Sequence, residues 1–446
     1  MKHYANNNNE AYKPARIRGR AYDERKTQPE PSRVPEGEKD PMELSAKLYR
    51  DTEPPKGHGV GRMIPMIVFL LFVFGFAVWF WVNPKSDFSE SEKRPLAKFP
   101  DMSVSSPQEF FEKTSYVLSG DFGKDFETFY ADQFPARKLW VGINAYSQKT
   151  AGINGADGVY KCKNGYLINK PKYDDNNLNR NLSVVEEFAQ TACNVPTTVL
   201  IAPSTGYICD DVLPPFHLPY RDDETFDMIS GRLSDKGIGF VDLREDFKTA
   251  YADGRQLYYK TDHHWTTEGA YTAYTALCRQ LGLEPAARNT FMVERYNGFY
   301  GTAYSSSGFW LNEADKLEVW NNPKNTADSV NVMITEGDKT EQFDSMFFYD
   351  HLKENDKYPV FIDGNHALTE ITNKNAKGGT LLVIKDSFSH CMAPFLAENY
   401  SKVVLVDMRY YKLPVSEIVK TINPERVLVL YGIDNLTTDT DLVWLE

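Results

Sequence analysis

Hydrophobic residues follow three different patterns along the chain. Residues 1–62 are mostly polar, with four consecutive Asn and repeated Pro and Glu, and such a segment buries too little apolar surface to offset its conformational entropy. Residues 63–83 are apolar, whereas residues 84–105 are polar again and typical of an extended linker. In residues 106–446, short apolar runs alternate with amphipathic ones. The pattern therefore predicts a disordered tail, an apolar helix, a linker and one folded domain.

Within the predicted domain, unbroken runs of β-branched residues and Leu indicate strands that are buried on both faces, as in a parallel sheet. These runs are residues 198–202, 239–242, 380–384, 403–406 and 427–431. Amphipathic patterns between them predict helices at residues 181–192, 222–236, 267–281, 390–398 and 415–422. The alternation of strand and helix predicts an α/β fold with a three-layer, doubly wound parallel sheet. Ligands of such sheets bind beyond the carboxyl ends of the strands, so the chemistry should cluster there.

The apolar segment Met63–Val82 predicts a membrane span. It contains no charged residue, and about 20 residues are enough to cross a hydrocarbon core of roughly 30 Å. Trp79 and Trp81 lie at one end of it, where an aromatic belt is expected. A signal peptide would be shorter, closer to the N-terminus and followed by small residues. We therefore expect a retained single-pass anchor, with a buried helix of a soluble protein as the alternative.

The basic residues give a weak indication of orientation. The segment before the anchor carries 13 Lys and Arg, but within about 20 residues of each membrane edge the counts are equal at four. The additional Lys and Arg farther from the membrane, in the segment before the anchor, favour a cytoplasmic N-terminus. The expected location is the cell membrane, with the folded domain outside the cytoplasm.

Charge and Cys content narrow the range of functions. The formal net charge of −12 repels a phosphate backbone, which argues against a nucleic-acid partner. All five Cys follow the anchor, and they form neither a Cys-x-x-Cys pair nor a regular spacing. This usage fits neither a zinc framework nor a dense disulfide scaffold, although a single disulfide stays open.

A candidate nucleophile follows the predicted strand 380–384. The sequence continues as Lys-Asp-Ser-Phe-Ser-His and then as a helical pattern, so Ser387 stands on a turn between strand and helix. Backbone N–H groups at such a turn face the same point as the serine hydroxyl and can stabilise an oxyanion. The alternative is that Ser387 only caps the helix, which is a common function of serine.

A candidate base and its orienting acid stand in the stretch Asp-His-His-Trp, where Asp262 and His264 precede a predicted helix. A serine hydroxyl needs a base to take its proton, and that base is usually a histidine held by a carboxylate. A Ser387–His264–Asp262 triad is therefore the first hypothesis. A metal site formed by Asp262, His263, His264 and Glu268 is the second, although no further cluster with ligand spacing completes it. A purely structural loop is the third. We predict no cofactor and no metal.

Two further segments are candidates for substrate binding. Arg409 and Tyr410 follow the predicted strand 403–406 and could contact a sugar hydroxyl or an acidic sugar, or they are ordinary surface residues. Residues 301–308 form a run of small residues of the kind that lines a glycan cleft, or a flexible connection.

Four stretches resemble the DHHW proteins, which are relatives of the SGNH-hydrolase-like alginate O-acetylation proteins. They are Ser91–Pro100, Phe126–Arg137, Thr261–Trp265 and Ile384–Ser389, and the last two are the more specific. The resemblance covers about residues 90–446 and implies an SGNH-hydrolase-like fold in which Asp262, His264 and Ser387 act together. His263 then needs no catalytic role. SGNH enzymes often take an oxyanion donor from an Asn on a Gly-x-Asn-like turn, which makes Asn435 a candidate; the alternative is an ordinary turn.

The same resemblance implies a function. The chain is expected to be a membrane-anchored O-acetyltransferase or acetylesterase that acts on cell-surface or secreted polysaccharide, with a multi-spanning membrane acyltransferase as a partner. One departure from the pattern is Lys385, which stands where many SGNH enzymes have Gly. The rival hypothesis is a catalytically degenerate protein of the cell envelope that binds glycans or assists assembly.

Overall fold

The computed structural model describes residues 59–192 and 195–445. The chain divides into two units, Met1–Gly75 and Phe76–Glu446, and each is described by itself. Every strand, and every helix after α2, belongs to the second unit.

Helix α2 (Gly59–Val82) begins in the first unit and ends in the second. Its segment Met63–Val82 is long and apolar enough to cross a membrane, by length and composition alone. Apart from the start of this helix, the predicted tail over residues 1–62 lies outside the described residues.

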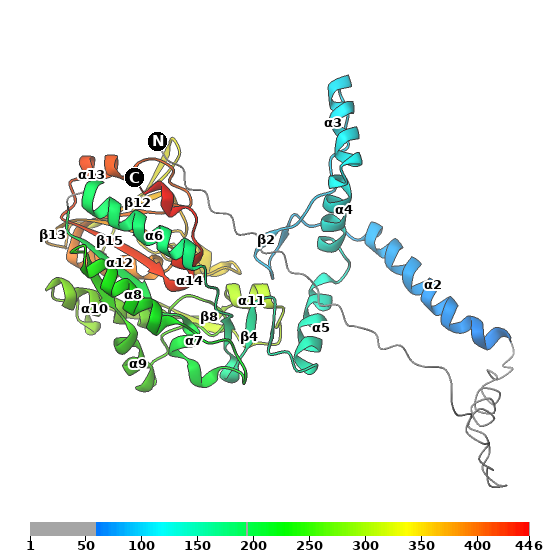
Figure 1. The fold of residues 1–446 in the computed structure, drawn as a ribbon, viewed down its shortest axis with the longest axis horizontal. Helices are drawn as coiled ribbons and strands as arrows, with labels where there is room; N and C mark the ends of the chain where they lie inside the picture. The colour runs from blue at the N-terminus through cyan, green and yellow to red at the C-terminus, as the bar shows by residue number, and fades with distance from the viewer. Residues whose placement is uncertain (1–58, 193–194, 446) are drawn as a thin grey trace, which may run out of the picture. The chain divides into compact units, whose positions relative to one another are not determined.

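The central element of the second unit is an eight-stranded sheet in the order β11-β10-β12-β14-β13-β15-β6-β7 (Figure 1). Its strands are β6 (Thr197–Ala202), β7 (Gly239–Asp242), β10 (Val330–Glu336), β11 (Lys339–Phe343), β12 (Leu368–Asn373), β13 (Gly378–Lys385), β14 (Tyr400–Val406) and β15 (Arg426–Gly432). The five strands from β14 to β7 are mutually parallel, and they are the five strands that the apolar runs predict. The other three extend one edge in antiparallel pairing. The predicted α/β class is confirmed, with a mixed rather than an entirely parallel sheet.

Helices cover both faces of the sheet, because successive residues of each parallel strand point to opposite sides. One face packs against α6 (Asp175–Glu187), α8 (Asp222–Ser234), α13 (Val415–Ile422) and α14 (Ile433–Thr438). The other packs against α7 (Thr205–Ile208), α9 (Arg244–Ala252), α10 (Thr267–Leu281) and α12 (Ser389–Asn399). In β13, for example, Leu382 and Ile384 belong to the first core and Leu381 and Val383 to the second. The result is the three-layer arrangement that the pattern predicts.

The segment before the sheet contains short strands and three helices. They are β1 (Phe88–Ser89), β2 (Arg94–Pro95), α3 (Pro107–Leu118), α4 (Asp121–Asp132) and α5 (Arg137–Thr150). Arg94 forms a two-bond ion pair with the buried Asp132, with distances of 2.5 and 3.0 Å. Arg137 donates to Glu92 at 2.8 Å. The two weaker stretches of the family resemblance therefore bind each other.

The remaining strands and helix α11 are not part of the eight-stranded sheet. They are β3 (Gly155–Ala156), β4 (Val159–Lys161), β5 (Leu167–Asn169), β8 (Met292–Phe299), α11 (Thr302–Ser307) and β9 (Asp315–Asn321). β3 to β5 form a small antiparallel sheet, and β8 pairs with β9. Four Cys of the described residues, Cys162, Cys209, Cys278 and Cys391, are buried free thiols, whereas Cys193 lies outside that part of the chain.

Candidate active site

The candidate residues come from two loops that lie far apart in the sequence. Asp262 and His264 precede α10, which has the bounds that the sequence predicts. Thr266 caps its start, and Gly282 follows its end in the left-handed conformation. Ser387 stands on the turn between β13 and α12, at the carboxyl end of a strand inside the parallel part of the sheet. This is the edge at which ligands of such sheets bind.

The structure brings Asp262, His264 and Ser387 into one hydrogen-bonded chain. His264 Nε2 lies 2.7 Å from Ser387 Oγ, and His264 Nδ1 lies 2.5 Å from Asp262 Oδ1. All three side chains are buried, with Asp262 2%, His264 5% and Ser387 8% exposed. Both imidazole nitrogens are therefore occupied, one by the acid and one by the hydroxyl.

The charge of Asp262 fixes the direction of these hydrogen bonds. Burial alone would raise the pKa of Asp262, but His264, through its charge and its hydrogen bond, and the nearby His263 outweigh burial and hold that pKa well below its usual range. The carboxylate also accepts from the backbone N–H of His264 at 2.8 Å and of Thr302 at 2.7 Å. Because a carboxylate only accepts, Nδ1 must carry the proton, and Nε2 is left to accept from Ser387.

Aromatic side chains hold the His264 ring in place. The ring of Tyr358 stacks on it with centroids 4.1 Å apart and planes 10° apart, and Phe388 approaches at 5.2 Å from another side. The fully buried Trp265 donates its indole N–H to the carbonyl of Phe388 at 2.9 Å. The Trp of the Asp-His-His-Trp stretch thus connects the loop that carries the base to the turn that carries the serine.

The turn around Ser387 is held by the residue before it. The buried carboxylate of Asp386 accepts from the backbone N–H groups of Phe388 and Gly432, at 2.9 and 2.8 Å, and from Asn435 Nδ2 at 2.7 Å. Burial raises the pKa of Asp386, and these three donors oppose that effect. Asn435, the predicted oxyanion donor, therefore lies next to the turn with one amide hydrogen held by Asp386. Ser387 Oγ makes no capping bond, and α12 begins two residues later without a side-chain cap.

Lys385 has a buried partner. It is 1% exposed, and its ammonium lies 2.9 Å from Asp407 Oδ2 and 3.0 Å from His390 Nε2. Arg409 donates to the same Asp407 at 2.8 and 2.5 Å and to Asn365 at 2.8 Å. The buried carboxylate of Asp407 therefore balances the charge of the Lys385 ammonium. Three of the five N–H groups of Arg409 already donate to Asp407 or Asn365.

Tyr410 and the 301–308 segment occupy different positions relative to the candidate triad. The Tyr410 side chain is half exposed, and its ring lies 5.5 Å from the Arg409 guanidinium. The 301–308 segment forms α11, which begins beside Asp262 and supplies the backbone N–H of Thr302 to it. A Cβ on Gly301 would lie 2.1 Å from Asp262 Oδ2, so only glycine permits this approach.

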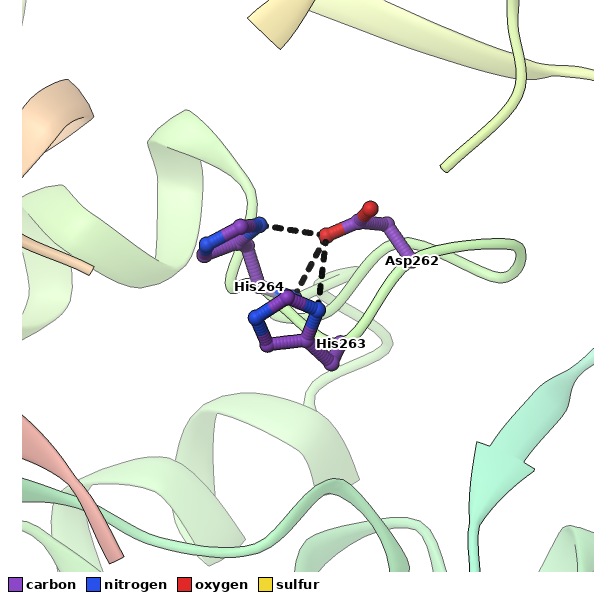
Figure 2. A group of neighbouring side chains, drawn as sticks. All are labelled: Asp262, His263 and His264. Atoms are coloured by element: carbon purple, nitrogen blue, oxygen red, sulfur yellow. Dashed lines mark hydrogen bonds and ion pairs between the residues drawn. The ribbon is translucent and has the colours of Figure 1, made fainter. Parts of the chain in front are cut away.

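Asp262, His263 and His264 also form a group that could hold a metal ion, and Figure 2 shows both imidazoles directed at the same carboxylate oxygen of Asp262. One ligand atom from each lies within 4.8 Å of the others. However, Ser387 and Asp262 occupy both nitrogens of His264, and Thr302 Oγ1 lies 2.6 Å from His263 Nδ1. Glu268 is not part of the group, since it forms ion pairs with Arg288 and Arg255.

Sequence reasoning did not single out several residues that shape this site. Tyr358 comes from a short turn far from any motif, and nothing in its local pattern distinguishes it. Thr302 and Gly301 lie in a segment that the sequence marked only as rich in small residues. Asp386 and Phe388 are the sequence neighbours of the predicted serine. Their hydrogen bonds could not be predicted, because Asp386 accepts from Gly432 of β15 and the carbonyl of Phe388 accepts from Trp265.

Two solved structures share the α/β fold of this chain. A DHHW family protein from Eubacterium siraeum has a TM-score of 0.52 and 19% identity, over 65% of this chain and 95% of its own. Bacillus cereus PatB1, in a structure with a sulfonyl adduct, has a TM-score of 0.53 and 19% identity, over 64% of this chain and 97% of its own.

A family model matches part of the chain. The family model described as DHHW protein matches residues 238–406, which contain the loop of Asp262 and the turn of Ser387, so the resemblance to DHHW proteins is confirmed.

The chain is also similar to the probable alginate O-acetylase AlgJ of Azotobacter vinelandii, 24% identical over 192 residues, 41% of this chain and 49% of that protein. The same-named protein of Pseudomonas fluorescens is 24% identical over 172 residues, 37% of this chain and 44% of that protein. The chain therefore matches about half the length of these relatives or less.

Proposed function

We propose that this chain is a membrane-anchored O-acetyltransferase or acetylesterase that acts on polysaccharide through Ser387, His264 and Asp262. The observation that carries the proposal is the hydrogen-bonded chain from carboxylate to imidazole to serine, assembled from two loops whose members are 123 positions apart. Nucleophilic catalysis by serine needs this order of groups. The similarity to probable alginate O-acetylases supports acetyl as the transferred group and polysaccharide as the acceptor.

The proposed reaction has two halves. Ser387 Oγ attacks the carbonyl carbon of an acetyl donor while His264 Nε2 takes the hydroxyl proton, and the bond to the leaving group breaks as His264 returns that proton to it. Asp262 stabilises the imidazolium that forms in between. A sugar hydroxyl then gives its proton to His264 and attacks the acetyl carbon, the bond between that carbon and Ser387 Oγ breaks, and His264 returns the proton to Ser387 Oγ. If water replaces the sugar, the same steps constitute an esterase.

The membrane part of the proposal rests on α2. Its segment Met63–Val82 has the length and composition of a membrane span, and the folded domain follows it. We propose a single-pass anchor with a cytoplasmic N-terminus, and a multi-spanning membrane acyltransferase as the donor of the acetyl group. Such an anchor would keep the acceptor site outside the cytoplasm, where secreted polysaccharide is modified.

The test is formation of an acetyl–enzyme. The detergent-solubilised full chain is mixed with p-nitrophenyl acetate, and intact mass is measured at short times. We expect one added acetyl group, mapped to Ser387 by peptide mass, and its loss in Ser387→Ala and His264→Ala. Ser306→Ala and His351→Ala are matched controls, because these side chains lie outside the hydrogen-bonded chain.

An adduct that persists in Ser387→Ala would contradict the proposal. Absence of any adduct and of hydrolysis in the correctly folded chain would favour the catalytically degenerate glycan-binding protein instead.

A further inference from the structure

Helix α2 packs against α4 and α5 before it ends. The ring of Phe76 stacks on that of Phe134 with centroids 5.6 Å apart, and it lies 6.0 Å from the ring of Trp140. These residues all belong to the second unit. Phe76 stands six positions before Val82, the last residue of α2, which is about 9 Å along an α-helix. The corner between α4 and α5 (residues 133–143) therefore reaches back to a level inside the apolar segment of α2.

The length of α2 decides whether this corner lies in water or in lipid. Met63–Val82 has 20 residues, which extend about 30 Å as a helix and match the thickness of a hydrocarbon core. If Phe76–Val82 stayed in water, residues 63–75 would extend only about 20 Å and would not cross the core. The residue before Met63 is Arg62, and a charged residue within the core is costly. If α2 spans the membrane, its contacts at Phe76 must therefore lie within the membrane too.

The side of α5 that carries Trp140 is apolar and exposed. Leu139, Trp140 and Ile143 share one side of the helix by their spacing, and they are 58%, 38% and 49% exposed. Large apolar side chains on one side of a helix are the part of an interfacial helix that enters the boundary between headgroups and acyl chains. The exposure of α5 is thus explained by a lipid surface beside α2.

The charge of this region also suits a membrane surface. Residues 133–156 contain Arg137, Lys138 and Lys149 but no Asp or Glu, although the chain has a net charge of −12. Arg137 is paired with Glu92 from the segment after α2. Basic residues next to an apolar face favour contact with anionic lipid headgroups.

The segment that follows α2 returns to α4. Gln133 donates to the carbonyls of Ser86 and Ala97 at 2.8 and 3.1 Å, and the backbone N–H of Ala97 donates to Asp132 at 2.9 Å. These bonds hold the start of the folded domain directly against the end of α2.

The opposite side of α5 is bound to the part of the domain that carries the candidate triad (Figure 1). Gly142 and Ala145 are buried there, and a Cβ on Gly142 would lie 2.8 Å from the Trp310 side chain. The indole N–H of Trp310 donates to the carbonyl of Lys138 at 2.7 Å. Trp310 follows α11, whose start holds Asp262. Helix α5 therefore connects the end of α2 to the candidate active site.

We propose that the α4–α5 corner is inserted into the bilayer surface, with Leu139, Trp140 and Ile143 in contact with lipid. The inference rests on the proposed function, in which α2 is the anchor. The folded domain then rests on the membrane at a fixed height, because α5 is bound on one side by lipid and on the other by the segment after α11. The expected depth of the apolar side chains is about 5–10 Å below the headgroups, as in other interfacial helices.

The experiment measures the depth of spin labels in a bilayer that contains no other protein. The full chain carrying Cys193→Ser is reconstituted into vesicles of phosphatidylcholine and phosphatidylglycerol, and a nitroxide is attached at Leu139→Cys or Ile143→Cys. Cys162, Cys209, Cys278 and Cys391 are buried and should resist labelling. Power-saturation spectroscopy compares collisions with O₂, which concentrates in hydrocarbon, and with a water-soluble nickel chelate.

Two exposed apolar positions supply matched controls. Val78→Cys, on α2, is the standard for lipid, and Met228→Cys, on α8, is the standard for water. We expect the ratio of O₂ to nickel collisions at both α5 positions to be close to that at Val78 and well above that at Met228. Circular dichroism checks that each labelled variant is folded.

The other outcomes each overturn the insertion. A water-like ratio on α5 beside a lipid-like ratio at Val78 would leave the anchor in place and remove only the inserted corner. Few collisions with either reagent would show that protein, such as a second copy of the chain, covers α5. A water-like ratio at Val78 would remove the anchor itself, whereas the acetyl–enzyme test of Ser387 depends on neither result.

Discussion

At the scale of single residues, Asp262 is the group whose chemistry is most constrained. It is buried, it accepts from two backbone N–H groups and from His264, and its pKa is held well below the usual range. We expect Asp262→Asn to lower kcat for acetyl transfer by at least about 100-fold with a small change in KM, because an amide can present its N–H to His264 and reverse the tautomer. Steady-state kinetics with p-nitrophenyl acetate measures this.

The same measurement separates the triad from the metal site. If Asp262 orients His264, activity should be the same before and after extended dialysis against EDTA. Loss of activity with EDTA and its recovery with added Zn²⁺ would show instead that Asp262, His263 and His264 act as ligands. Asp253→Asn is the matched control for Asp262→Asn, because Asp253 is exposed.

Much of the candidate site could be predicted from the sequence, but contacts between segments that are distant in the sequence could not. Asp262, His264 and Ser387 stand in short stretches of sequence, so they could be singled out without knowing which distant segments surround them. Tyr358 and Thr302 act through a stacked ring and one backbone N–H, which depend on where distant segments come together. Asn435 was predicted from its turn, yet its contact with Asp386 depends on the pairing of β13 with β15.

At the scale of elements, Trp265 fixes the loop before α10 to the turn before α12. Its indole is fully buried and donates to the carbonyl of Phe388. Trp265→Phe removes that donor and leaves a cavity, so we expect a loss of about 2–4 kcal/mol in the free energy of unfolding. Activity of the folded fraction should also fall, because Phe388 contacts the His264 ring.

Urea denaturation followed by circular dichroism measures the first effect, and acetylation per folded molecule measures the second. Trp444→Phe is the matched control, because that side chain is half exposed near the C-terminus. Equal losses in the two variants would contradict the connecting role of Trp265.

At the scale of the whole molecule, the pattern of the sequence predicted the buried part of the sheet better than its edge. β6, β13, β14 and β15 each contain an unbroken apolar run, because helices cover both of their faces. β10 instead reads Val-Asn-Val-Met-Ile-Thr-Glu and buries alternate residues. That alternation of period two is a strand signal, but it is characteristic of an antiparallel strand with one polar face. The antiparallel extension was therefore detectable in principle, and a search for unbroken apolar runs does not find it.

The stability of the whole molecule should depend on pH through Asp434. This residue lies in the first turn of α14 and lines a small cavity with His263, and burial and the nearby Asp222 raise its pKa to about 7. An unfolded chain would release this proton near pH 3.9, so between about pH 4 and 7 the folded state binds the extra proton. Stability then falls as pH rises through that window, because ionising the carboxyl costs more in the folded state.

Asp434→Asn removes this pH-dependent contribution to stability and leaves the hydrogen bonds of the candidate triad in place. We expect its melting temperature to exceed that of the unaltered chain at pH 8, with a gain in unfolding free energy of about 2 kcal/mol after allowing for partial exposure, and to equal it near pH 4. Asp227→Asn, whose side chain is exposed on α8, keeps Asp434, so its melting temperature should follow the same pH dependence as that of the unaltered chain. Thermal melts of the three proteins across this range measure the difference, and parallel curves would show that Asp434 is ionised in the folded protein throughout.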